Sequence, residues 1–186
     1  MRNLLKGLST GLGCLLLVGS LQASKNSVFH ERVQLVKEIE TRLNTSFQCE
    51  FSVSIGKTRK YATTNSSGII IIDRSFLQTA DRDRIFFALA HEYAHAYLEH
   101  DVLLFQHLKK SRTQDGYRLA EVRRRLEKEA DGIAARKAKQ MGFSVDSVIQ
   151  FILANPDPEK GLALSHRAYS KPRDRADYIL AVYRSS

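Results

Sequence analysis

The chain has 186 residues and a formal net charge of +9, from 29 Lys and Arg against 20 Asp and Glu. Apolar residues make up 43% of it, with only three Pro and ten Gly, so a sizeable core can form and a disordered or collagen-like chain is excluded. The sequence contains no internal repeat, and we expect one compact domain of ordinary size.

The first 23 residues are typical of an export signal. Arg2 and Lys6 form a short basic N-terminal region, and an apolar run follows from Gly7 to Leu21. The small residue Ala23, just after this run, offers a cleavage site. An uncleaved anchor is the alternative, although a run of roughly 15 residues is shorter than the ~20 that span a bilayer. We therefore expect a signal peptide at residues 1–23, a single domain at residues 24–186, and a periplasmic or otherwise exported protein. Cys49 alone would remain after cleavage, which leaves no internal disulfide.

Apolar spacing predicts an α+β fold. Residues 28–47 have a helical stripe, and residues 49–55 alternate between apolar and polar side chains as a half-buried strand does. Residues 61–64 and 69–73 are β-prone and flank a turn at 65–68, so we expect a small antiparallel sheet. Beyond Asp81, a candidate N-cap, the pattern predicts helices over 82–109, 116–141, 145–153 and 173–183.

The most informative residues lie in the first of these later helices. Residues 85–98 are apolar almost all round except for His91, Glu92 and His95. Two histidines four residues apart share one helix face and can bind a single metal ion, and the neighbouring Glu92 can act as general base on a water bound to that ion. The alternative is a solvated helix face with incidental histidines, which the apolar flanks disfavour.

A second helix supplies carboxylates at the same spacing. Glu127 and Asp131 lie four residues apart, so one can bind the ion while the other accepts the free ring N–H of a ligand histidine. Small residues at 130, 132, 134 and 135 would let this helix lie close against the first. Glu-rich helices are usually solvated, and it is the combination with the His91–His95 pair that indicates a metal site.

These motifs resemble a known family. The segment His91-Glu92-Tyr93-Ala94-His95, followed by His100-Asp101 and later by Glu127 to Asp131, is similar to the HExxH…ExxxD pattern of gluzincin metallopeptidases, in particular the HtpX-like and periplasmic β-barrel-assembly-associated branch. The resemblance covers residues 49–140. It implies a zincin-like fold, with the small antiparallel sheet packed on an active-site helix and a second ligand-bearing helix.

The same resemblance implies roles for single residues. His91, His95 and Glu127 are similar to the zinc ligands, Glu92 to the catalytic base and Asp131 to the partner of a ligand histidine, while Glu129 is the alternative ligand. His166 is a candidate for stabilising the oxyanion or reaching the metal, and Arg173 for supporting His166, although the proline that the family places beside this histidine is missing.

The expected function is that of an exported zinc metalloendopeptidase that cleaves unfolded or misassembled envelope proteins. We expect a zinc-bound water, activated by Glu92, to attack the peptide bond of a substrate strand aligned beside residues 69–72. A catalytically silent binding or chaperone-like module is the alternative.

The basic segments 109–112 and 123–125 and the apolar run 102–105 suggest peripheral contact with an anionic membrane. No nucleic-acid motif accompanies the positive charge, so nucleic acid is not an expected partner.

Overall fold

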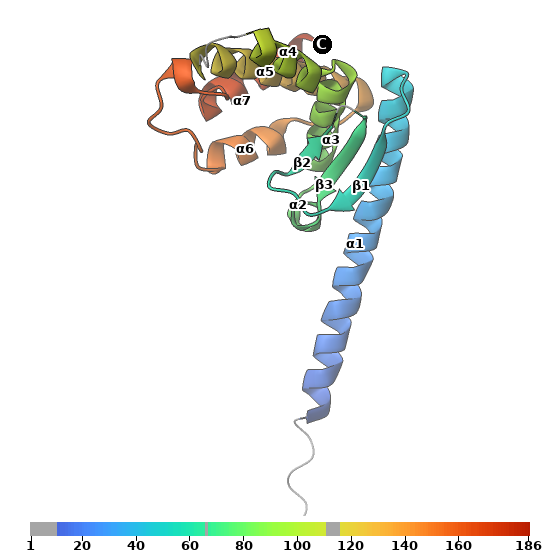
Figure 1. Ribbon diagram of the computed structural model, residues 1–186. Helices are drawn as coiled ribbons and strands as arrows, with labels where there is room; N and C mark the ends of the chain where they lie inside the picture. The colour runs from blue at the N-terminus through green and yellow to red at the C-terminus, as the bar shows by residue number, and fades with distance from the viewer. Residues whose placement is uncertain (1–10, 66, 111–115) are drawn as a thin grey trace, which may run out of the picture.

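A computed structural model describes residues 11–65, 67–110 and 116–186, with side chains from Ser27 onward except that of Lys110. The first ten residues of the expected signal peptide, Ser66 of the expected turn and Arg112 of the basic segment lie outside this range. Figure 1 shows the elements in chain order: α1 (Gly11–Phe47), β1 (Ser52–Gly56), β2 (Ala62–Thr64), β3 (Ile69–Asp73), α2 (Arg74–Thr79), α3 (Arg82–Tyr97), α4 (His100–Lys110), α5 (Gly116–Met141), α6 (Asp146–Ala154), a 3-10 turn (Leu164–His166) and α7 (Pro172–Ser185).

The α+β class is confirmed, but the expectation of a purely antiparallel sheet is wrong. The strand order is β1-β3-β2, with β2 antiparallel and β1 parallel to β3. Residues 57–61, between β1 and β2, carry the chain past the position of β3, so that β1 and β2 lie on opposite sides of β3 and do not pair. Gly68, at φ +72°, then lies in the turn from β2 into the antiparallel β3. β3 is therefore the central strand, and Ile70 and Ile72 are completely buried.

Helix α3 lies between the sheet and α6, and α5 packs across it (Figure 1). The C-terminal half of α1 covers β1 and α3 with the predicted stripe, of which Val36, Ile39 and Leu43 are buried. Small residues on α5 allow its close approach to α3 as predicted, and Ala130, Ala134, Ala135 and Ala138 are fully buried. Together these contacts form one hydrophobic core.

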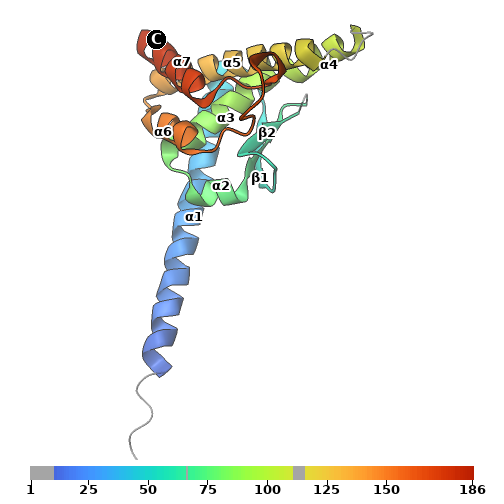
Figure 2. The same ribbon diagram turned by 90° about the vertical axis from the view of Figure 1, so that its left-hand side faces the viewer.

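The expected continuous helix over 82–109 is interrupted. Helix α3 begins after Asp81, whose side chain accepts the backbone N–H of Arg84 as predicted for an N-cap, and ends at Tyr97. Glu99 then adopts a left-handed φ of 51°, and α4 starts at His100 in a new direction. Figure 2 shows α4 beside α5, at the end of the molecule opposite α2. The break was not predictable because neither Gly nor Pro marks it.

Within the described residues, no helix combines the length and apolarity required to cross a membrane.

Candidate metal centre

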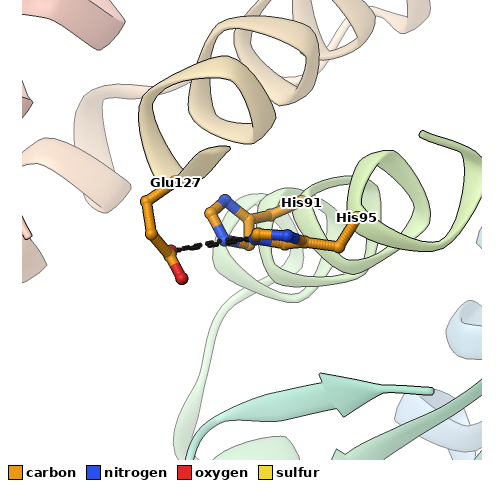
Figure 3. A group of neighbouring side chains, drawn as sticks. All are labelled: His91, His95 and Glu127. Carbon is orange, nitrogen blue, oxygen red and sulfur yellow. Dashed lines mark hydrogen bonds and ion pairs between the residues drawn. The ribbon is translucent and has the colours of Figure 1, made fainter. Parts of the chain in front are cut away.

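Helix α3 presents His91 and His95 toward α5, one turn apart. His91 is buried and His95 is half-buried, since the apolar residues that surround them on α3 pack into the core. Glu127 projects from α5 toward both rings (Figure 3). The two helices are held at this short separation by the alanines of α5, so the sequence features that bring the helices together also bring the polar side chains together.

The three predicted ligand side chains meet at one point. Nε2 of His91 lies 3.2 Å from Oε2 of Glu127 and 3.0 Å from Nε2 of His95, and the His95 Nε2 to Glu127 Oε2 distance is 3.7 Å. All three donor atoms lie within 4.8 Å of one another. His91, His95 and Glu127 could therefore hold a metal ion.

Asp131 and Arg175 continue the cluster behind His91. Nδ1 of His91 lies 3.0 Å from Oδ1 of Asp131. Arg175, on α7, donates from Nε and Nη2 to the two carboxylate oxygens of Asp131, each at 2.7 Å. Burial alone would raise the pKa of Asp131, but the Arg175 and His91 interactions lower it overall, so Asp131 is held as a carboxylate facing the histidine.

The electrostatics of the cluster favour a cation. Burial would lower the pKa of His91, but its interactions with Asp131 and Glu127 outweigh burial and raise it to about 10. The pKa of Glu127 is lowered, against burial, by hydrogen bonds with His91 and His95. The protein therefore stabilises positive charge at the point where the three donor atoms meet, which is the charge that a metal ion would supply.

His100 is a further member of the cluster, to which the sequence analysis assigned no role. Its Nδ1 lies 2.8 Å from Nδ1 of His95, and its Nε2 lies 3.6 Å from Oε2 of Glu129. Glu129, the alternative ligand, therefore approaches His100, while Glu127 joins the ligand group. A continuous helix would have placed His100 about 140° round from His95, so only the break at Glu99 allows the contact.

Glu92 follows His91 on α3 and is half-buried at the edge of the cluster. Its charge and that of Glu127 act on Lys60, in the segment between β1 and β2, whose Nζ lies 5.9 Å from the ring centroid of Tyr169. Partial desolvation opposes the charged form of Lys60, but Tyr169 and the two carboxylates raise its pKa overall. A cationic side chain therefore lies near the two carboxylates of the cluster.

The structure does not bring His166 and Arg173 to the cluster. The ring of His166 packs on Tyr117, with centroids 4.1 Å apart, and Tyr117 precedes Glu127 on α5 by ten residues, or about 15 Å along the helix axis. The side chain of Arg173 is 78% exposed and pairs with Asp177. Arg175, one half-turn further along α7, is the arginine that reaches the cluster. A single sequence gives no signal that distinguishes the two, because their partner lies on another helix.

No protein-family model matches the chain, and comparisons with curated proteins and with solved structures likewise found no match.

Proposed function

We propose that the protein is a zinc-dependent metalloendopeptidase. The observation that carries the proposal is the spacing of the donor atoms of His91, His95 and Glu127, which lie 3.0, 3.2 and 3.7 Å apart. Ligands of a tetrahedral zinc ion with bonds of 2.0–2.1 Å are separated by about 3.4 Å. Two imidazoles and one carboxylate are also the ligand set of many catalytic zinc sites, in which the fourth position stays open.

The protein side chains divide the work of peptide hydrolysis. When bound, zinc would supply Lewis acidity, which makes a water easier to deprotonate and a carbonyl easier to attack. The Glu92 carboxylate takes the proton of the attacking water and passes it to the nitrogen of the leaving amine. Asp131, held by Arg175, orients the His91 ring so that its Nε2 faces Glu127, with which it would hold the ion.

The substrate position differs from the sequence-based expectation. A strand cannot be added beside residues 69–72, because β3 is paired on both sides. β2 is the edge strand that contacts α3, and it begins two residues after Lys60 in the chain. We propose that an extended polypeptide pairs with β2, which aligns the scissile bond through the backbone and places little demand on sequence. Unfolded or misassembled envelope proteins fit this mode of binding.

A metal analysis combined with a degradation assay tests the proposal. Purified wild type should contain one zinc ion and degrade casein, while Glu92→Gln should retain zinc and lose cleavage. His95→Ala should lose both, because it removes a ligand. Equal cleavage by wild type and Glu92→Gln would refute the role of Glu92. Zinc and unfolded-protein binding without any turnover by wild type would favour the chaperone-like alternative.

We also propose that α4 rests on an anionic membrane surface. Phe105 and Leu108, three residues apart on one face of α4, are 61% and 49% exposed, and Lys109 lies over the Phe105 ring. A groove beside α5 is lined by basic side chains, among them Arg118, Arg125 and Lys128, together with His107 of α4 and two acidic residues, Glu121 and Asp174. An apolar helix face next to basic side chains suits the boundary between acyl chains and anionic headgroups.

Vesicle sedimentation tests the membrane contact. Wild type should bind vesicles that contain phosphatidylglycerol more strongly than neutral vesicles, and the double variant Phe105→Ser/Leu108→Ser should bind several-fold less while keeping its stability, because both side chains are already exposed. Equal binding to both kinds of vesicle, or binding that the double variant retains, would contradict the proposal.

A further inference from the structure

We propose that His100 is a positioning residue for His95: it accepts the Nδ1–H of His95 and thereby directs the Nε2 lone pair of His95 toward the metal ion. The proposal rests on the proposed metal site. It assigns to His95 the kind of partner that Asp131 is to His91, but with an uncharged imidazole in place of a carboxylate.

The contact is short and shielded from water. Nδ1 of His100 lies 2.8 Å from Nδ1 of His95, and the two rings meet edge to face at 83° with centroids 4.8 Å apart. His100 is only 2% exposed. Two ring nitrogens at this distance must share one proton, because two bare lone pairs would repel each other and two N–H groups would clash. The question is which ring carries it.

Glu129 decides the location of that proton. Nε2 of His100 is buried and has no hydrogen-bond partner among the described residues, but the Glu129 carboxylate lies nearby, with Oε2 at 3.6 Å. A carboxylate favours an N–H over a bare nitrogen, so the His100 proton belongs on Nε2. Nδ1 of His100 is then the acceptor, and His95 carries its proton on Nδ1 and leaves Nε2 bare.

The same reasoning places a proton on Nδ1 of both His91 and His95. Nδ1 of His91 faces the Asp131 carboxylate and is therefore protonated. Both Nε2 atoms would face a bound ion. Without the ion they lie 3.0 Å apart and must share one proton, which belongs on His91 because its Nε2 is closer to the Glu127 carboxylate, 3.2 Å against 3.7 Å. Nε2 of His95 is then bare in both states. If His100 instead donated from Nδ1, the proton of His95 would move to Nε2 and occupy the place of the ion.

The break between α3 and α4, at Glu99, is what brings His100 to His95. Because Glu99 is left-handed, the chain turns after α3 and His100 folds back over His95 rather than pointing away from it. His100 is not a fourth ligand, since its Nδ1 contacts the side of the His95 ring opposite Nε2. Its remaining nitrogen faces Glu129.

Nitrogen NMR of the metal-free protein at pH 8 and zinc titration against a chromophoric chelator test the proposal together. Wild-type His95 should be protonated on Nδ1. His100→Leu removes the acceptor, so His95 should populate the Nε2–H tautomer and zinc affinity should fall about 10–100-fold, the usual effect of losing such a partner. His100→Asn places an amide near the former Nδ1 and should restore most of the affinity.

His100→Gln is the matched control, because its amide lies nearer the former Nε2 position, and it should remain as weak as His100→Leu. The Asn and Gln pair carries the test if the Leu variant does not fold. An unchanged His95 tautomer, with zinc affinity within twofold of wild type in the Leu or Gln variant, would overturn the role of His100. A wild type that binds no zinc would overturn the proposed function, while the His95 tautomer in the metal-free protein would still test His100.

Discussion

Helices α3 and α4 follow one another with only two residues between them, yet their surroundings differ. Along α3, Ile85, Phe86 and Leu89 are completely buried, and the helix is enclosed by the sheet, α5 and α6. Among the side chains of α4 that the structure describes, only that of the first residue, His100, is buried, and the apolar residues that follow are largely exposed. Both helices contain short apolar runs, so hydrophobic content alone does not decide burial; the number of neighbouring elements does.

Because α3 is buried and α4 is exposed, the two helices contribute differently to the candidate metal centre and to the surface. α3 supports the side chains of the candidate metal centre, because the helix is packed on several sides and its apolar side chains are buried. α4 adds one side chain to the cluster and leaves the rest of its surface for contacts outside the chain. Variants that probe the two helices should therefore affect stability very differently.

The largest difference is expected for matched leucine truncations. Leu89→Ala on α3 creates a cavity in the core and should lower the free energy of unfolding by about 3 kcal/mol. Leu103→Ala on α4, where the side chain is 40% exposed, should change it by less than about 0.5 kcal/mol. Urea unfolding of both variants measures this, and similar losses at the two sites would show that α4 is part of the core.

A smaller effect is expected for Asp131→Asn, which tests the support behind α3. The change leaves Arg175 without its charged partner and should cost about 2 kcal/mol at neutral pH. Because the folded-state pKa of Asp131 is below its ordinary value, the wild-type contribution is present above that ordinary value and disappears as the pH falls through the folded pKa. The stability difference between wild type and variant should therefore narrow in acid. A constant difference from pH 7 to pH 3 would contradict the pairing.

The smallest effect is expected at the junction of the two helices. Glu99→Gly relieves a left-handed backbone but adds freedom to the unfolded chain, so it should stabilise the protein by about 0.5 kcal/mol. Glu99→Val places a branched side chain at the same φ and should destabilise by about 1 kcal/mol. Thermal unfolding distinguishes the two. If Val proves no worse than Gly, the junction is not left-handed and α3 continues into α4.

Local patterns in the sequence predicted much of this arrangement. The spacing of His91 and His95, the N-cap at Asp81 and the small residues of α5 each depend on neighbours within a few turns of one helix, and the structure shows them as expected. Glu127 lies on a second helix, and it was predictable because its four-residue spacing to Asp131 matches that of the histidine pair. The parallel pairing of β1 with β3 was missed because strand order depends on the path of the connecting segment, which local alternation does not report. Arg175 was missed for a similar reason, since its partner is determined by how α7 packs on α5.

The bond between Arg175 and Asp131 has a consequence for biosynthesis. A ribosome completes the histidine pair and Glu127 before it adds α7, so a nascent chain holds every ligand while Asp131 still lacks the cation that keeps it ionised in the folded protein. Until α7 docks, Asp131 would lack the guanidinium that offsets its burial beside His91. The cluster is therefore complete only when α7, whose Arg175 lies 44 residues beyond Asp131 in the chain, has packed against α5.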